Sequence, residues 1–275
     1  MTPVTLRSPA KVNLFLSVGP PDAAGYHPLR SVMQAVGLFD EIQITPADQD
    51  GLECNWPGMP AENTLTKTLR LIREQVPLPP VHIRLTKSIP AESGLGGGSG
   101  NAGALIRWAK SAVAHRIDDD FFFDVARAVG ADVPFFLVGG RARAEGYGER
   151  LTPLPDAEPA WLVIVRPEVG VSTAAAYRAL DAAPREWRDW PDLTASVPTW
   201  LYNDFERVAP CLCGEVGERL QLAGAEGALL SGSGSAVFGW CSTPEQAHAV
   251  ADRIRSESLG QVWVAPTLSR EESLA

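Results

Sequence analysis

The residues best suited to chemistry lie in a glycine-rich segment, residues 92–101, which reads Glu-Ser-Gly-Leu-Gly-Gly-Gly-Ser-Gly-Asn. The segment follows a predicted strand and leads into a predicted helix. Glycine lets backbone N–H groups approach an anion closely, and a helix N-terminus adds partial positive charge. Ser99, at the junction with the helix, offers a hydroxyl for phosphate or Mg²⁺. We therefore predict that this segment binds phosphate and is more than a flexible turn.

Three familiar phosphate-binding patterns do not fit this segment. It lacks the Gly-Lys-Ser/Thr ending of a Walker P-loop. It also cannot be aligned with Gly-x-Gly-x-x-Gly, either of dinucleotide-binding folds or of protein kinases, because Ser99 or Asn101 takes the place of the last glycine.

Three further segments carry polar groups that could serve such a site. Lys11 and Asn13 are two residues apart on a predicted strand and share its polar side, although Lys11 alone is typical of a solvated edge strand. Asp132 precedes an apolar segment predicted as a strand, where, taken alone, it is more typical of a residue that caps or turns the chain. The turn at residues 231–235, Ser-Gly-Ser-Gly-Ser, could bind an anion or form a tight hairpin.

Alternating and helical patterns predict the elements that must position these groups. Alternation predicts strands over most of the first 45 residues and from Val81 to Leu85. Apolar residues three and four apart predict a helix that is capped by Asn63 and stops before Pro77. A helix is predicted from Ala102 to about His115, and another after the acidic residues 118–120.

A Pro-rich polar stretch at residues 153–159 predicts a domain boundary, which divides the chain into residues 1–155 and 156–275. Beyond it, the patterns predict a strand from Trp161, a helix at 172–180, two more helices, a strand-turn-strand at 227–240, a helix at 244–256 and a last strand at 262–265. This mixture predicts an α+β fold. The Trp- and Pro-rich stretch 184–200 is irregular, and the sequence indicates no role for it.

Composition limits the class of protein. The 275 residues are 45% hydrophobic and 21% charged, which is typical of a globular chain of one large or two modest domains. The formal net charge of −9 disfavours a nucleic acid polymer as partner, because phosphate neutralisation supplies most of that affinity. Any anionic substrate must therefore be held by a local positive site.

The four cysteines and four histidines lack metal-ligand spacing, so we expect no zinc site and reduced, buried thiols. Lys11 and Asn13 interrupt the apolar stretch near the N-terminus, and no run reaches the 18 or more apolar residues typical of a membrane span. We expect a cytoplasmic protein without a membrane partner; the oligomeric state is left open.

Taken in order, residues 8–14, 90–100 and 231–237 resemble the three signature segments of the GHMP kinase superfamily, which includes galactokinase, homoserine kinase, mevalonate kinase and phosphomevalonate kinase. Finer marks resemble the branch that phosphorylates 4-diphosphocytidyl-2-C-methyl-D-erythritol: Gly-Tyr-His at 25–27, Gly-Ala-Asp-Val-Pro-Phe-Phe at 130–136 and the extended glycine run. The resemblance covers residues 6 to about 265. It implies a ribosomal protein S5 domain 2-like N-terminal domain that binds ATP and a ferredoxin-like C-terminal domain, with the active site between them.

The resemblance also implies roles for individual residues. Asp132 would be the general base for the substrate's 2-hydroxyl, with Lys11 beside it keeping the carboxylate ionised and screening charge on the transferred phosphoryl group. Mg²⁺ would assist the transfer. The implied ATP-binding residues are Pro90, Ala91, Glu92, Ser93, Gly94, Leu95, Gly96, Gly97, Gly98, Ser99, Gly100 and Asn101.

The substrate would be held by five residues. Asn13 would orient the alcohol, and Lys87 would reach polar groups of the nucleotide or substrate. His27 would hydrogen-bond the cytosine edge while Tyr26 and Tyr177 stack on its faces, since a flat base suits aromatic walls. Tyr177 could instead be only a core aromatic.

Two positions depart from the family pattern. Members usually carry small apolar residues or glycine before the Gly-Leu-Gly run, where this chain has Glu92, so we predict that its carboxylate faces solvent or a cation. Gly100 replaces a common Ser or Thr. Two alternative functions remain open: a GHMP kinase for another alcohol, such as mevalonate or homoserine, and an inactive nucleotide-binding protein on this scaffold.

Overall fold

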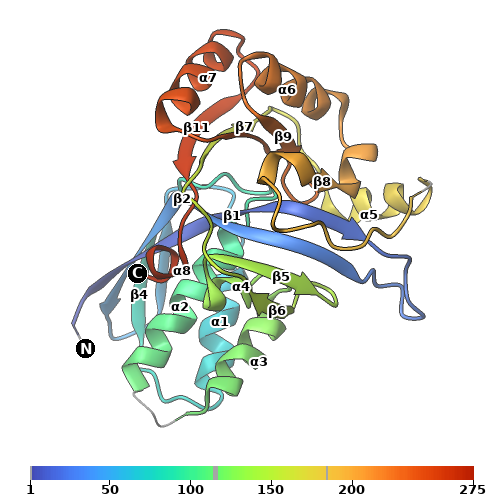
Figure 1. The fold of residues 1–275 in the computed structure, drawn as a ribbon. Helices are drawn as coiled ribbons and strands as arrows, with labels where there is room; N and C mark the ends of the chain where they lie inside the picture. The colour runs from blue at the N-terminus through green and yellow to red at the C-terminus, as the bar shows by residue number, and fades with distance from the viewer. Residues whose placement is uncertain (1, 114–116, 184) are drawn as a thin grey trace.

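The computed structural model describes residues 2–113, 117–183 and 185–275, which form two β-sheets with helices on their outer faces (Figure 1). The first sheet contains β1 (Val4–Val18), β2 (Leu29–Pro46), β3 (Gly51–Cys54), β4 (Val81–Thr86), β5 (Arg141–Glu145), β6 (Arg150–Pro153) and β8 (Tyr202–Asn203). The second contains β7 (Trp161–Arg166), β9 (Gly227–Leu230), β10 (Val237–Cys241) and β11 (Gln261–Pro266).

The long antiparallel pair β1–β2 forms the centre of the first sheet, whose order is β3-β4-β2-β1-β8, with β5 joined to β2 and β6 to β5. Three helices pack on one face and share an apolar core with β2 and β4. They are α1 (Thr64–Arg73), α2 (Gly97–Val113) and α3 (Asp119–Val129). The short helix α4 (Phe135–Val138) connects this layer to β5.

Helix α1 illustrates how local sequence produces these elements. Leu65, Leu69 and Ile72 are buried and lie three and four residues apart. Asn63 caps the helix, because its side-chain oxygen accepts from the backbone N–H groups of Leu65 and Thr66. The predicted helix and its cap are both confirmed.

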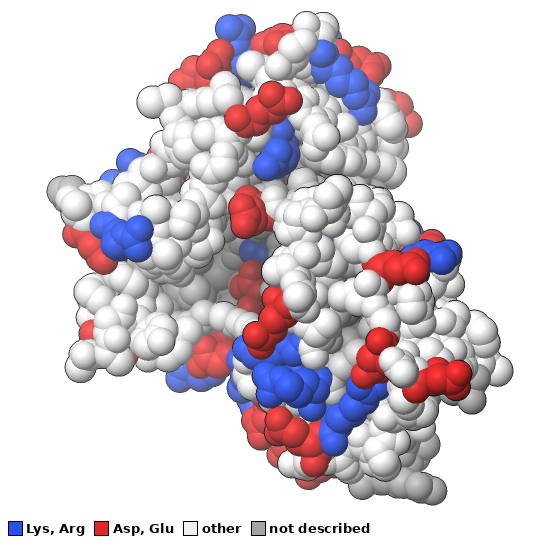
Figure 2. All heavy atoms as spheres, turned by 180° about the vertical axis from the view of Figure 1, so that it is seen from behind, with Lys and Arg blue, Asp and Glu red and all other residues white. Residues whose placement is uncertain are grey.

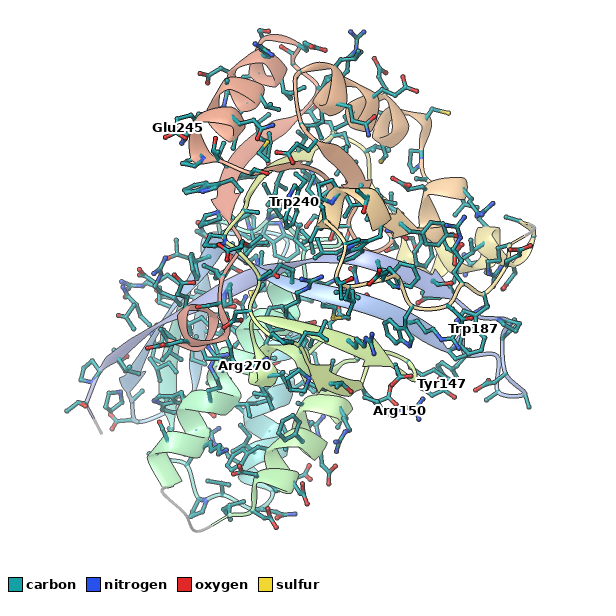
Figure 3. The ribbon with its side chains drawn as sticks, in the orientation of Figure 1. Tyr147, Arg150, Trp187, Trp240, Glu245 and Arg270 are labelled. Atoms are coloured by element: carbon teal, nitrogen blue, oxygen red, sulfur yellow. The ribbon has the colours of Figure 1, made fainter. Side chains whose placement is uncertain are left out.

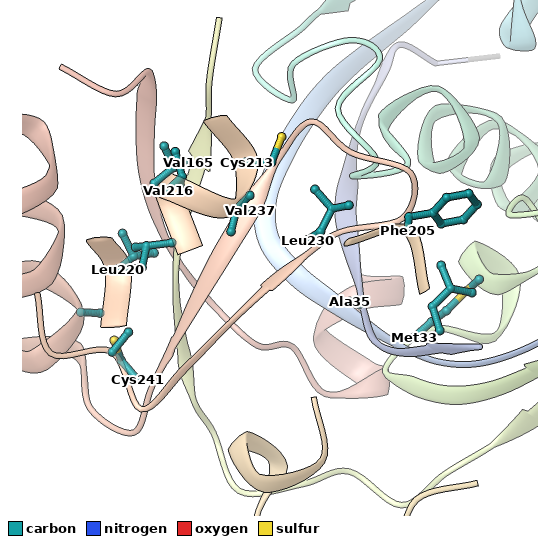
Figure 4. Close-up of a cluster of buried hydrophobic side chains, with 14 of the residues drawn as sticks. Met33, Ala35, Val165, Phe205, Cys213, Val216, Leu220, Leu230, Val237 and Cys241 are labelled. Carbon is teal, nitrogen blue, oxygen red and sulfur yellow. The ribbon is translucent and has the colours of Figure 1, made fainter. Parts of the chain in front are cut away.

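The second sheet has the strand order β11-β7-β10-β9 with antiparallel neighbours, and α6 (Cys211–Leu222) and α7 (Pro244–Ser256) cover its outer face. This is the ferredoxin-like arrangement expected for the C-terminal half. Figure 4 shows apolar side chains of α6 meeting those of β7 and β10. Helix α5 (Thr173–Asp181) lies between β7 and these elements in the sequence.

The two sheets share a hydrophobic core. Val12 and Leu14 of β1 lie in one buried cluster with Leu162 and Ile164 of β7 and Phe238 of β10. Because alternate residues of a strand face opposite sides, Lys11 and Asn13 then point away from this core. Central strand β1 therefore joins the two halves and carries polar groups on its other face.

Arginines anchor the Trp-rich segment that follows α5, of which Pro184 lies outside the described residues. Each of three guanidinium groups lies over a tryptophan ring, which is a favourable cation–π geometry. The pairs are Arg30–Trp187 at 4.3 Å, Arg143–Trp190 at 4.9 Å and Arg141–Trp200 at 5.2 Å, measured from Cζ to the ring centroid. The segment is thereby tied to β2 and β5.

The start of α2 differs from the sequence prediction. The helix begins at Gly97 and not at Ala102, and the predicted end at His115 lies outside the described residues. Glycine is a poor helix former, but here close packing requires it. A Cβ at Gly100 would lie 2.7 Å from the carbonyl oxygen of Pro9, and one at Gly103 would lie 2.5 Å from Cβ of Phe136. Tertiary contact has therefore overridden helix propensity.

The apolar segment after Asp132 is also different, because it forms helix α4 where a strand was predicted. Pro134 precedes the helix with helical backbone angles, and Gly139, at φ 68°, ends it. The run between them is too short for its apolar pattern to distinguish strand from helix.

The proposed division at residues 155/156 stays a prediction. The two sheets separate between β6 and β7, but two later segments return to the first half: β8 pairs with β1, and α8 (Arg270–Leu274) contacts α4 and β2. Over the described residues, no helix has the length and apolar character needed to cross a membrane.

Candidate active site

A cavity of about 910 Å³, the central cavity, lies where the glycine segment, β1, the 231–235 turn and α5 meet. Its wall includes the predicted residues Lys11, Asn13, Asp132, Ser99 and Tyr177. Figure 2 shows the molecule hollowed on one face, with acidic and basic side chains within the hollow and at its rim. The structure thus brings residues from five separate segments to one site.

Lys11 and Asp132 form an ion pair in the central cavity, with Nζ and Oδ2 3.3 Å apart. The Lys11 side chain is 4% exposed, whereas that of Asp132 is 34% exposed and can be reached by a ligand. Lys11 also donates to Oδ1 of Asn13 at 2.7 Å, and Asn13 donates to the hydroxyl of Ser31. This network fixes the ammonium group of Lys11. The interpretation of Lys11 as a solvated residue of an edge strand is therefore wrong.

Asn13 therefore holds Lys11 in place, and its amide lies at the cavity wall with partners on both polar atoms. Its predicted contact with a substrate alcohol stays a prediction.

The glycine segment is held between β1 and the C-terminal half. The backbone N–H of Lys11 donates to the carbonyl of Leu95 at 2.9 Å, and the hydroxyl of Ser231 donates to the carbonyl of Gly94 at 3.0 Å. Gly94, at φ 80°, has no room for a side chain, because a Cβ there would lie 1.9 Å from the carbonyl oxygen of Ser231. The backbone of this loop is thereby fixed from both sides.

The glycines lead directly into α2, whose first turn contains no acidic residue. The N–H groups of such a turn have no acceptor within the helix and attract an anion. Because α2 begins at Gly97, the N-terminus lies nearer to the middle of the glycine segment than predicted, and Ser99 is already inside its first turn. This geometry supports the predicted phosphate-binding role of the segment.

Lys87 and Asn101 are both directed to Asp40, a residue that the sequence analysis did not identify. The Asp40 carboxylate is fully buried and accepts from Lys87, from Nδ2 of Asn101 at 3.0 Å and from the N–H groups of Ser88 and Ile89, both at 2.8 Å. Four donors suffice to stabilise a buried charge. Asp40 thus joins the residues just before the glycine segment to Asn101 at its end.

A second cavity, of about 570 Å³, lies on the other side of the glycine loop. Trp56, Met59 and Thr64 contribute to its wall beside Lys87, and Glu92, Gly94, Gly96 and Ser99 border both cavities. The glycine loop therefore separates two cavities, the central one lined by Lys11 and the second by Lys87.

The turn at residues 231–235 completes the central cavity from the C-terminal half. Its Gly232, Ser233 and Gly234 lie in the wall. The hydroxyl of Ser233 is 3.0 Å from that of Thr173 in the first turn of α5, so the turn and the helix are joined at the cavity. Thr173 was not identified from the sequence.

Tyr177 lines the central cavity and packs against His27. Their ring centroids are 5.2 Å apart, and Tyr177 also packs edge-on against Phe205. Burial raises the pKa of Tyr177 to about 12, and nearby Asp132 adds to the shift, so the phenol stays neutral at ordinary pH. Tyr177 lines the cavity and is more than a core aromatic.

Both nitrogens of His27 already have protein neighbours. Nδ1 is 3.0 Å from the carbonyl oxygen of Gly19, and Nε2 is 3.3 Å from Oδ1 of Asp181. The ring packs against Tyr177 while its edge meets these groups. Its predicted hydrogen bond to a cytosine edge stays a prediction.

Tyr26 is 64% exposed and lies next to Tyr147, with ring centroids 5.6 Å apart. Tyr147 lines the central cavity, at the turn between β5 and β6 (Figure 3). Tyr147 was not predicted from the sequence. A tyrosine flanked by Gly146 and Gly148 is the signal that could have identified it.

Glu92 is exposed at the border of the two cavities, as predicted for a carboxylate beside a phosphate site. In the described part of the chain, no group of three or more His, Cys, Asp or Glu residues is arranged to hold a metal ion. The four cysteines are free; Cys213 and Cys241 are buried, Cys54 is half-buried and Cys211 is exposed, so the predicted burial holds for only some of them.

Comparison with known proteins finds two family models that match the chain. Residues 63–140 match the family model described as GHMP kinases N terminal domain, and residues 176–259 match that described as GHMP kinases C terminal. Among curated proteins, the chain is 39% identical to 4-diphosphocytidyl-2-C-methyl-D-erythritol kinase of Geobacter metallireducens, over 94% of this chain and 96% of that protein. It is 37% identical to the protein of the same name from Desulfitobacterium hafniense, over 95% and 94% of the two chains.

Solved structures agree with this assignment. The chain superimposes on a crystal structure of 4-(cytidine 5'-diphospho)-2C-methyl-D-erythritol kinase with a TM-score of 0.82 and 32% identity, covering 96% of this chain and 99% of the other. A homoserine kinase from Cytophaga hutchinsonii shares the fold, with a TM-score of 0.70 and 20% identity over 99% and 96% of the two chains. The predicted α+β fold is confirmed. By these matches and by its fold, the chain belongs to the GHMP kinase family.

Proposed function

We propose that the chain transfers the γ-phosphoryl group of ATP to the 2-hydroxyl of 4-diphosphocytidyl-2-C-methyl-D-erythritol, giving the 2-phosphate and ADP, in the non-mevalonate pathway of isoprenoid precursor biosynthesis. One observation carries the proposal: the Lys11–Asp132 pair lies in a cavity bordered by the glycine loop and lined by aromatic side chains. Relatives bearing this substrate's name cover almost the whole chain.

Asp132 acts as the general base. Its carboxylate is accessible from the cavity and accepts the proton of the substrate alcohol as the oxygen attacks phosphorus. Lys11, held by Asn13, stays beside Asp132 and stabilises negative charge on the transferred group. Catalysis then rests mainly on positioning and electrostatics.

The glycine loop holds the phosphates of ATP at the N-terminus of α2, and the nucleotide base lies in the second cavity beside Trp56. Mg²⁺ in proteins commonly binds one or two side-chain oxygens together with substrate phosphates and water. The hydroxyl of Ser99, which borders both cavities, would hold it here. When bound, the ion neutralises phosphate charge during transfer.

The aromatic residues in the cavity wall favour a substrate with a base. Tyr177 and Tyr147 line the cavity, whose volume of about 910 Å³ is large for an alcohol as small as mevalonate or homoserine. Flat aromatic walls suit a pyrimidine, which stacks well on tyrosine.

The substrate is tested by measuring ADP release with the cytidylyl alcohol, mevalonate, homoserine and no acceptor. We expect turnover with the cytidylyl alcohol only. Turnover with mevalonate alone would overturn the substrate assignment, and no turnover with any acceptor would favour an inactive nucleotide-binding protein.

The role of Asp132 is tested by Asp132→Asn, which retains shape but removes the base. The expected loss in kcat is about 10²–10⁴-fold. Asp124→Asn is the matched control, because Asp124 is an exposed residue of α3 that pairs only with Arg127 among the described contacts. A loss below about tenfold for Asp132→Asn would assign the residue a positioning role instead.

A further inference from the structure

The loop between β1 and β2, residues 20–27, carries Tyr26 and His27 and is organised by Asp22. The Oδ1 atom of Asp22 accepts from the N–H groups of Ala24 and Tyr26, both at 2.9 Å, and the N–H of Asp22 donates to the carbonyl of Tyr26 at 2.8 Å. One carboxylate oxygen is thereby used entirely inside the loop.

The other carboxylate oxygen reaches a distant part of the chain. Oδ2 of Asp22 accepts a hydrogen bond from the hydroxyl of Tyr147, which is 125 residues away in sequence. Tyr147 is fixed at its other end, because its backbone N–H donates to Glu149 at 2.7 Å. Figure 3 shows Tyr147 at the end of the β5–β6 hairpin, beside the loop that follows β1. The contact thus joins the hairpin to the loop.

Both groups have the protonation states that this bond needs. The hydroxyl of Tyr147 and the loop N–H groups lower the pKa of Asp22, and the carboxylate of Asp22 raises the pKa of Tyr147. The carboxylate is therefore ionised and the phenol neutral throughout the usual assay range.

The position of Tyr147 suits contact with a ligand as well as a structural role. Tyr147 is 46% exposed, yet its ring is held by the Asp22 bond, by its backbone and by the ring of Tyr26. It also lines the same cavity as Tyr177 and Asp132. A ring that is restrained in solvent at the mouth of a cavity presents a flat surface before any ligand arrives, which lowers the entropy cost of binding.

We propose that Tyr147 and Asp22 form a latch, in which Tyr147 serves as a wall for the substrate's base and the hydrogen bond holds the 20–27 loop in its binding position. The inference rests on the proposed function, since it assigns positioning residues for the cytidylyl end of that substrate. Sequence motifs did not include either residue.

The latch is tested by Tyr147→Phe, Asp22→Asn, the double variant and Tyr147→Ala, with KM and kcat measured for the cytidylyl alcohol and for ATP. We expect Tyr147→Phe and Asp22→Asn each to raise the KM of the alcohol by about three- to tenfold, the range for one hydrogen bond. The double variant should be no worse than either single one. Tyr147→Ala should exceed both, while kcat and the KM of ATP stay within about twofold. Additive single effects, or a normal KM in Tyr147→Ala, would overturn the latch.

A second readout keeps the latch testable if the wild-type chain fails to use the cytidylyl alcohol, an outcome that counts against the proposed function alone. Hydrogen exchange at the amides of Ala24 and Tyr26 should be faster in Tyr147→Phe than in the wild type. Tyr202→Phe is the matched control, because it removes the hydrogen bond from Tyr202 of β8 to Asp204, and it should leave these two amides unchanged. Unchanged exchange in Tyr147→Phe would refute the latch.

Discussion

Two loops serve the proposed site, and they are built in opposite ways: the glycine loop lines the central cavity, and the 20–27 loop contacts Tyr147 in the cavity wall. The glycine loop has Gly94 at φ 80° and is tied to a fully buried Asp40, whereas the 20–27 loop has Gly25 at φ 82° and is tied to an exposed Asp22. A Cβ at Gly94 would collide with backbone, but one at Gly25 would meet nothing within 4 Å. The backbone of the proposed phosphate-binding loop is thus closely packed at Gly94, whereas the loop of the proposed base site is held by a few exposed contacts.

The two glycines offer the sharpest test of this comparison. Gly94→Ala should cost more than about 4 kcal/mol of unfolding free energy, because positive φ and a collision with the Ser231 carbonyl act together. ATP turnover should fall below detection. Gly25→Ala, with the same sign of φ and open space, should cost about 1 kcal/mol. Chemical denaturation and ADP release measure both. Equal costs for the two variants would contradict the comparison.

The two carboxylates provide the next test. Asp40→Ala leaves Lys87 and the N–H groups of Ser88 and Ile89 without their buried acceptor, so we expect a loss of about 3–5 kcal/mol in unfolding free energy and a higher KM for ATP. Asp22→Ala should leave the melting temperature unchanged and raise only the KM of the alcohol. If the melting temperature dropped as far in Asp22→Ala as in Asp40→Ala, the exposed and the buried carboxylate would contribute equally to stability, which would contradict the comparison.

The smallest effect is expected at Glu92, which is exposed although it belongs to the tightly held loop. Glu92→Ala should leave the KM of ATP and its salt dependence unchanged, because an exposed carboxylate is screened by water and ions. A large drop in the KM of ATP would show that Glu92 points toward the phosphates and repels them.

Local sequence signals predicted most elements well. The helix at 244–256 has the predicted bounds, and the strand at 81–85 and the cap at Asn63 are in place. Lys11 and Asp132, which lie 121 positions apart, could be joined only through the resemblance, since neither segment alone indicates the other.

Asp40 and Tyr147 could not be predicted, because their roles depend on residues distant in sequence. The contact of Asp40 with Lys87 spans 47 positions, and that of Tyr147 with Asp22 spans 125. In the sequence, Asp40 looks like any polar residue beside an alternating run. The early start of α2 was missed for a similar reason: the glycines that lower helix propensity are required by contacts with Pro9 and Phe136.

Strand β1 has one consequence for how the site can vary. Its alternate residues supply the shared core of both sheets and the polar floor of the cavity. Inserting one residue before Lys11 would exchange the two faces, placing an ammonium group in the core and Val12 in the cavity. The alternation of side chains along β1 therefore links catalytic geometry to folding. Sequence changes that alter the site without unfolding the enzyme are expected in the loops around this strand.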